Sequence, residues 1–318
     1  MITKDINLAK SILQQNELVA IPTETVYGLA GNAYSEIAIK KIFDLKQRPY
    51  YNPLIVHLKS ASSVFDIATD IPETALQLMD RFWPGPLTLV LKKQDHISDL
   101  ITAGKSTVAV RVPSHPLTLA LLNELDFPLT APSANPFGSI SPTNADHVYN
   151  YFGEALAAIL DGGPCEKGLE STIIGFEGSQ PILYRLGAIS TEEIEATIGK
   201  LSMLTNNDTN PNAPGMLSRH YAPKTSTYLS SNVAEYINQF EGKKIGLLVF
   251  KQPIQNDKVF IQEILSSSGD FSEAAKNLYA AMHRLDQSEL DLIIVEKLPE
   301  TELGNTINDK LARATKKA

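Results

Sequence analysis

The pattern of apolar and polar positions changes near residue 201, and the two parts predict different folds. In the first part, short apolar runs bounded by Pro, Gly or Lys are typical of strands. They occur at 18–21, 54–58, 87–91, 108–112, 129–131, 158–160, 171–176 and 182–185. Helical spacing of apolar residues occurs at 6–15, 35–45, 117–123 and 144–152. Many short strands with few helices between them favour an α+β unit built on a large, twisted, mixed sheet.

Residues 202–224 are rich in Asn and Pro and show no periodicity, so a linker is predicted there. After the linker, apolar runs alternate with helical patterns, which favours a small α/β domain with a parallel sheet. Its strands are expected at 227–229, 244–250, 259–260 and 290–295, and its helices at 233–240 and 271–285. The predicted organisation is therefore a domain at 1–201, a linker at 202–224 and a domain at 225–318.

The composition narrows the class of protein. The 318 residues are 43% hydrophobic and 20% charged, as in an ordinary globular protein. The single cysteine, Cys165, allows no internal disulfide, and no apolar run approaches the ~18 residues of a membrane span. We therefore expect a cytoplasmic protein. The net charge of −8 argues against nonspecific nucleic-acid binding but leaves a local basic patch open.

Common catalytic motifs are absent from the sequence. Gly104, Lys105 and Ser106 resemble the end of a P-loop, but Asp99 stands where its first glycine belongs. Zinc-hydrolase, serine-hydrolase and dinucleotide-binding motifs are missing as well. The chemistry must therefore come from polar residues near the predicted strand ends.

One polar cluster follows the first buried strand. Thr23 and Thr25 stand on a segment that we expect to open into a helix, where hydroxyls could orient a small polar ligand or simply cap the helix. A second cluster holds Lys46 and Arg48 just before a proline, which suits polyphosphate oxygens, although a solvated helix end would also explain it.

Two further arginines complete a cationic set. Arg111 lies within a buried strand and needs a partner, which could be a ligand anion, Glu24 or Asp161. Arg185 ends another strand. Four cations amid hydroxyls, with no histidine–carboxylate nucleophile system, suit phosphoryl or nucleotidyl transfer better than covalent catalysis.

An ordered series of motifs supports a more specific hypothesis. PTETVYGLA, KQRPYYNPLIVH, FWPGPLT, VAVRVP, APSAN with SISPT, GLESTI and RLGAI together resemble the Sua5/YrdC/YwlC family. APGMLSRHYAP and INDKLARA resemble its longer, two-domain Sua5 form. The resemblance implies a YrdC-like first domain with a concave cavity and a Rossmann-like second domain. It also implies L-threonylcarbamoyladenylate synthase activity: ATP, L-threonine and bicarbonate give threonylcarbamoyl-AMP and pyrophosphate. That product serves the modification of adenosine beside the anticodon of tRNA.

The resemblance also implies roles for individual residues. The expected L-threonine contacts are Thr25, His57, Arg111 and Ser171. The expected ATP contacts are Arg48, Asn52, Thr107, Ala131, Ser133, Ser141, Arg185 and Tyr221. Lys46 and Arg48 are the expected catalytic cations, and Asn135, Arg219 and His220 are further candidates. The linker is expected to cover the site as a lid, Mg²⁺ to accompany ATP with unknown ligands, and a downstream tRNA threonylcarbamoyltransferase to receive the product.

One alternative remains open at this point, and a second is excluded by missing segments. The first domain could be an RNA-binding module without nucleotidyl transfer, and direct tRNA contact is compatible with either function. An enzyme using carbamoyl phosphate, like the hydrogenase maturation factor HypF, would need zinc-finger and acylphosphatase segments that this sequence lacks.

Overall fold

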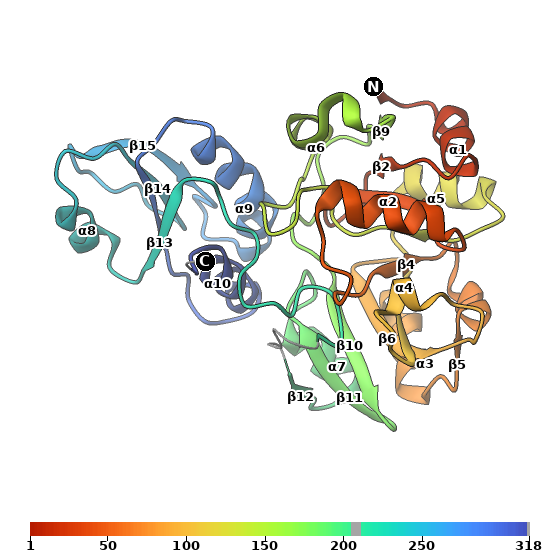
Figure 1. Ribbon diagram of the computed structural model, residues 1–318. Helices are drawn as coiled ribbons and strands as arrows, with labels where there is room; N and C mark the ends of the chain where they lie inside the picture. The colour runs from red at the N-terminus through yellow and green to blue at the C-terminus, as the bar shows by residue number, and fades with distance from the viewer. Residues whose placement is uncertain (205–210, 317–318) are drawn as a thin grey trace.

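The computed structural model describes residues 1–204 and 211–316, which form two domains joined by a linker that runs between them (Figure 1). The first domain is built on a mixed sheet of twelve strands within the described residues. In spatial order these are β1 (Ile2–Thr3), β9 (Ala158–Leu160), β2 (Val19–Ile21), β3 (Gly28–Asn32), β8 (Leu129–Thr130), β4 (Ile55–His57), β7 (Thr107–Arg111), β6 (Leu87–Lys93), β10 (Thr172–Glu177), β11 (Gln180–Arg185) and β12 (Ser202–Met203), with β5 (Ala68–Thr69) paired to β6. The predicted mixed sheet is confirmed. It includes Ser202–Met203, just beyond the predicted end of the domain.

Helices of the first domain pack around this sheet (Figure 1). They are α1 (Ile6–Gln14), α2 (Glu36–Lys46), α3 (Glu73–Phe82), α4 (Asp99–Thr102), α5 (Pro116–Glu124), α6 (Ala145–Phe152) and α7 (Thr191–Ile198). All four predicted helices are present, while α3, α4 and α7 were not predicted. The Ser35 hydroxyl caps α2 at its start, and Gln47 ends it in a left-handed conformation at φ 52°.

Side chains alternate along each strand, so the two faces of the sheet pack against different parts of the molecule. On one face, Val56, Leu89 and Val110 belong to the largest apolar core, beneath the helices. On the other face, Ile55 and Ala109 belong to a smaller cluster that the linker covers with Ala213 and Met216. Because strand side chains alternate, each strand serves both faces. The linker-covered face holds the candidate site.

The segment after β2 departs from the prediction. We expected the Thr23–Thr25 segment to open into a helix, and this is wrong, because the chain turns into β3, antiparallel to β2. Neither threonine caps a helix. The Thr23 hydroxyl instead accepts hydrogen bonds from the amides of Thr25 and Val26 and so stabilises the turn. Gly28 then permits the close approach of β3 to Ala131.

The second domain has the predicted parallel sheet. Its strands, in spatial order, are β13 (Ser226–Ser230), β16 (Leu292–Glu296), β14 (Ile245–Val249) and β15 (Val259–Ile264). Its helices are α8 (Val233–Tyr236), α9 (Phe271–Asp286) and α10 (Leu303–Ala314). In the described part of the chain, no helix is long and apolar enough to cross a membrane.

The two domains share an apolar core. Val26, Ile140 and Leu169 of the first domain pack in one cluster with Leu278 of α9 and Ile307 of α10. Figure 1 shows α9 on the side of the second domain that faces the first. Burial of this shared core fixes α9 and α10 next to the candidate site.

Candidate active site

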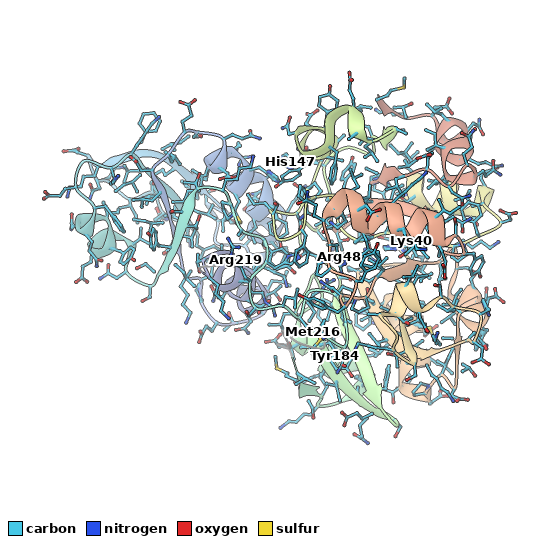
Figure 2. All side chains as sticks on the ribbon, viewed as in Figure 1. Lys40, Arg48, His147, Tyr184, Met216 and Arg219 are labelled. Atoms are coloured by element: carbon cyan, nitrogen blue, oxygen red, sulfur yellow. The ribbon has the colours of Figure 1, made fainter. Side chains whose placement is uncertain are left out.

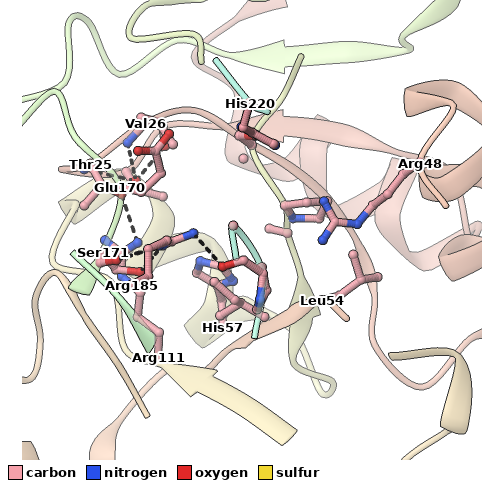
Figure 3. Close-up of a pocket in the computed structure, with 18 of the residues that line it drawn as sticks. Thr25, Val26, Arg48, Leu54, His57, Arg111, Glu170, Ser171, Arg185 and His220 are labelled. Carbon is pink, nitrogen blue, oxygen red and sulfur yellow. Dashed lines mark hydrogen bonds between the residues drawn. The ribbon is translucent and has the colours of Figure 1, made fainter. Parts of the chain in front are cut away.

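A cavity that is open at its mouth lies between the sheet and the linker. Within the described residues, its walls include three arginines, one histidine from the sheet and a set of hydroxyls (Figure 3). The lining residues are Thr23, Thr25, Val26, Gly28, Arg48, Leu54, Ile55, His57, Arg111, Ala131, Pro132, Ser133, Glu170, Ser171, Arg185, Pro214, Gly215, His220 and Tyr221.

The paired ends of β4 and β7 supply one wall. His57 and Arg111 are register partners on these parallel strands, so both side chains project to the same face. Burial, and then the charge of Arg111, lower the pKa of His57 to about 3, so its imidazole is neutral at physiological pH. This neutral ring can recognise a polar substrate group by hydrogen bonding.

Arg111 already has a charged partner within the protein. One guanidinium nitrogen lies 2.6 Å from a carboxylate oxygen of Glu24, and another donates to the Thr25 hydroxyl at 2.9 Å. Of the partners left open by the sequence, Glu24 is the one observed. A substrate carboxylate would therefore share Arg111 with Glu24 rather than neutralise an unpaired charge.

A register shift in β11 turns Arg185 toward the same cavity. Ile174 lies opposite Leu183, whereas Ile173 lies opposite Arg185, so β11 has one extra residue at Tyr184. Such a bulge redirects the following side chain. Arg185 then donates to the backbone oxygen of Ser171 at 2.8 Å and to its hydroxyl at 3.0 Å. Simple alternation along the sequence could not reveal this orientation.

Arg48 enters from the opposite side of the cavity in the view of Figure 3. Its guanidinium donates to the backbone oxygens of Asn52 and Pro53, at 3.1 and 2.7 Å. Burial, and then the charge of Arg185, lower its pKa to about 9, which still leaves it charged at neutral pH. Three cationic side chains thus face one space.

Lys46 ends helix α2 but is not solvated, contrary to the alternative that a helix end suggested. Its ammonium is buried and donates to the backbone oxygens of Ser133 and Asn135. Burial, and then Arg48, hold its pKa well below the usual value. In this structure Lys46 shapes the loop that carries Ser133 and does not line the cavity.

Linker residues form part of the cavity wall, on the side where the lid was expected; residues 205–210 of the expected lid lie outside the described residues. The Pro214 backbone oxygen accepts from Arg185 at 3.3 Å, while His220 and Tyr221 form part of the wall. Tyr221 is buried in a left-handed conformation at φ 64°, which is unusual for a bulky residue. Arg219 departs from the expectation: it is exposed, bonds the backbone oxygen of Lys316 and lies toward the second domain (Figure 2).

Several buried polar atoms near the cavity have no hydrogen-bond partner within the described residues. They belong to Asn52, His57, Asn135, His220 and Tyr221. An unsatisfied buried polar group is costly, and such groups persist mainly where a function requires them. Their concentration around one cavity indicates a binding site for a polar ligand.

The remaining expected ATP contacts lie at or beyond the edge of this cavity. Asn52 is buried under the loop that Arg48 holds, and Ser141 donates to Glu170 at 2.6 Å. Thr107 shares a sheet face with Ala109 and Arg111 but lies at the far end of β7, outside the cavity wall. Thus the structure brings most of the expected residues together and leaves Thr107 and Arg219 apart.

Sequence reasoning missed Glu170 as a site residue. It is the one carboxylate among the cavity-lining side chains of the described residues. Its position inside the GLESTI motif was the available signal, but only the tertiary structure shows which way its side chain points.

The comparisons with known proteins agree with this architecture. Residues 11–187 match the family model Sua5_yciO_yrdC, described as "Telomere recombination", and residues 189–315 match one described as "Threonylcarbamoyl-AMP synthase, C-terminal domain". The chain belongs to the Sua5 family.

Relatives of this Sua5 family member are similar over nearly their whole length. A Bacillus subtilis threonylcarbamoyl-AMP synthase is 41% identical, covering 96% of this chain and 91% of the relative. A Schizosaccharomyces pombe protein of the same name is 36% identical, covering 96% and 87%. The crystal structure of Pyrococcus abyssi Sua5 complexed with L-threonine superposes with a TM-score of 0.92 at 39% identity, covering 98% of this chain and 94% of that one.

Proposed function

We propose that this chain is a threonylcarbamoyl-AMP synthase that condenses L-threonine, bicarbonate or CO₂, and ATP, with release of pyrophosphate. The observation that carries the proposal is the convergence of Arg48, Arg111 and Arg185 on one cavity beside neutral His57 and Ser171. The names of the near-full-length relatives support the same activity.

The amino acid fits the wall formed by the ends of β4, β7 and β10. Arg111 and Thr25 would take its carboxylate, while His57 and Ser171 are placed for its polar groups. The ATP phosphates would lie toward Arg48 and Arg185, beside Ser133 and the small side chain of Ala131. Tyr221 from the linker would cover the nucleotide.

The chemistry needs positioning more than a protein nucleophile. Threonine's amine takes up CO₂ to form a carbamate and releases a proton. A carbamate oxygen then attacks the α-phosphorus of ATP, and pyrophosphate leaves. Two anions must be held side by side, so the arginines supply the required electrostatic stabilisation. The linker excludes water from the labile carbamate and the mixed anhydride.

Lys46 and magnesium support this arrangement in different ways. We assign Lys46 to holding the Ser133 loop in place for the nucleotide, since its ammonium bonds that loop. Magnesium would enter with ATP and be held mainly by phosphate oxygens and water, as is usual for this ion. No group of three or more His, Cys, Asp or Glu side chains in the described residues is placed to hold a metal.

The product is a reactive adenylate, so a transferase must accept it. We propose the tRNA threonylcarbamoyltransferase reaction as that step, with the adenosine beside the anticodon as the final acceptor. Direct tRNA binding is not required, because the cavity encloses small-molecule groups.

The test is pyrophosphate release by purified protein with ATP, magnesium and bicarbonate. We expect release with L-threonine and little with L-serine or L-valine, and mass spectrometry should detect threonylcarbamoyl-AMP. Turnover should not change after ribonuclease treatment. Absence of threonine-dependent release, together with tight RNA binding that weakens steeply with salt, would favour the RNA-binding alternative instead.

A further inference from the structure

One route from the second domain to the cavity is a chain of side-chain hydrogen bonds through Glu170. Glu170 lines the cavity, and one of its carboxylate oxygens accepts from the Ser141 hydroxyl at 2.6 Å. Its other oxygen accepts from the hydroxyl of Tyr279, on α9 of the second domain, at 2.8 Å. Both oxygens of the carboxylate are therefore fixed, one from each domain.

Tyr279 is held rigidly in this contact. Its side chain is fully buried, and its ring lies 5.7 Å from that of Tyr221 in the linker. Burial, and then the charge of Glu170, raise its pKa well above the usual value, so the hydroxyl keeps its proton. It can therefore act only as a hydrogen-bond donor to the carboxylate at physiological pH.

Helix α9 packs tightly against the segments of the first domain that carry Ser141 and Glu170. The hydrogen bond between Tyr279 and Glu170 therefore belongs to the packed interface between the domains. Gly168 has φ 72°, and a Cβ there would lie 2.5 Å from the Cα of Lys276, so the GLES turn and the helix are in direct backbone contact. One turn beyond Tyr279, a ring nitrogen of His283 lies 3.2 Å from the Ser141 backbone oxygen. Helix α9 thus contacts both Ser141 and Glu170.

The position of the Glu170 carboxylate suits the binding of a substrate amino group. Glu170 is buried, with only 5% of its surface exposed, and it faces a cavity with three arginines. Within the described residues it nevertheless forms no ion pair. Its neighbour in the chain, Ser171, belongs to the expected threonine site. A fixed carboxylate there can accept a hydrogen bond from the N–H of an amino-acid substrate, first as an ammonium and then as a carbamate.

We propose that Tyr279 is a positioning residue of the second domain that holds Glu170 in place for the amino group of the amino-acid substrate. Since Glu170 is assigned to a substrate amine, this proposal rests on the proposed function. It gives the second domain a direct part in substrate recognition, beyond supporting the linker.

The experiment compares Tyr279→Phe, Glu170→Gln and the double variant in the full chain. Tyr279→Phe should lower kcat/KM for L-threonine about tenfold, through a higher KM, with little change in KM for ATP. Glu170→Gln should lose at least as much. If Tyr279 acts through Glu170, the double variant should be no worse than Glu170→Gln alone.

Tyr151→Phe is the matched control. The Tyr151 hydroxyl also lies at the domain boundary, but it donates to the backbone oxygen of Ile140, and its ring contacts His283. We expect this variant to remain within twofold of wild-type kcat/KM. An equal loss in Tyr151→Phe and Tyr279→Phe would show a general docking effect and overturn the proposal.

Calorimetric titration with L-threonine separates this proposal from the proposed function. A wild-type chain that binds threonine without forming the adenylate would refute the synthase function, while the variants' threonine affinities would still test the positioning role. Wild-type threonine affinity in Glu170→Gln would overturn the proposal even if Tyr279→Phe failed to fold. The proposal would also be overturned if the loss of kcat/KM in the double variant equalled the product of the two single losses. A wild-type chain that neither binds nor converts threonine would overturn both.

Discussion

The sheets of the two domains bury different kinds of side chain. In the first, the linker-covered face mixes apolar residues with His57, Arg111 and Arg185. In the second, β14 is buried along its whole length and carries only Gly and aliphatic residues. Among the described residues, every one that lines the cavity lies between 23 and 221. The first domain therefore supplies the charged side chains of the cavity wall, whereas the second domain supplies none of the lining residues among those described.

The second domain acts through the helices at its edge. On α10, Arg313 donates to the backbone oxygens of Gly215 and Leu217, at 2.6 and 3.0 Å, and so holds the linker. Lys310 donates to the Leu186 backbone oxygen at 2.8 Å, beside the turn that follows Arg185. This explains the INDKLARA motif, whose charges face the first domain and the linker. A domain without cavity-lining residues can still determine the geometry of a site.

The largest expected effect comes from removing a charge of the first domain. Arg48→Ala should reduce threonine-dependent pyrophosphate release about 100-fold or more, because a donor aimed at developing negative charge is lost. Steady-state pyrophosphate assays measure this effect. The control is Lys40→Ala, on the exposed face of α2 just before Arg48, where a 3.8 Å ion pair with Glu36 is lost. Near-normal turnover by Arg48→Ala would contradict the assignment of the cavity.

A smaller effect is expected from the second domain's hold on the linker. Arg313→Gln should lower kcat about tenfold, because two bonds from a charged donor to linker carbonyls are weakened. Arg284→Gln is a matched control, since Arg284 forms its ion pair with Glu263 at 2.7 Å, within the second domain. Equal kcat values for the two variants would mean that Arg313 does not control the linker.

The smallest expected effect is a pH dependence of folding stability that comes from two histidines at the boundary between the domains. His147 and His283 stack at 3.9 Å, and burial lowers their pKa values to about 3 and about 4. Unfolding restores a pKa near 6.5, so the unfolded chain binds more protons between about pH 4 and 6.5. Stability should therefore fall as the pH is lowered through this window.

His283→Gln provides the test of that linkage. Between pH 7.5 and 5.5 the variant should lose about 1 kcal/mol less unfolding free energy than the wild type, because one titrating group is removed. Urea unfolding at the two pH values gives both losses. An identical loss in the two proteins would show that His283 does not contribute.

The sequence by itself determined the division into an α+β and a parallel α/β domain, most strands, and the set of cationic motifs. Periodicity and turn residues are local properties, and they are written directly in the order of residues. The family resemblance added the expected site residues, most of which the fold brings into one cavity.

Only the tertiary structure decided how those residues are used. The pairing of Arg111 with Glu24 and the contact of Glu170 with Tyr279 join residues 87 and 109 positions apart (111 − 24 and 279 − 170). The orientation of Arg185 depends on one extra residue in β11, and β3, which forms a hairpin with β2, also pairs with the distant strand β8. Such contacts follow from packing between distant segments, which no local pattern of residues encodes.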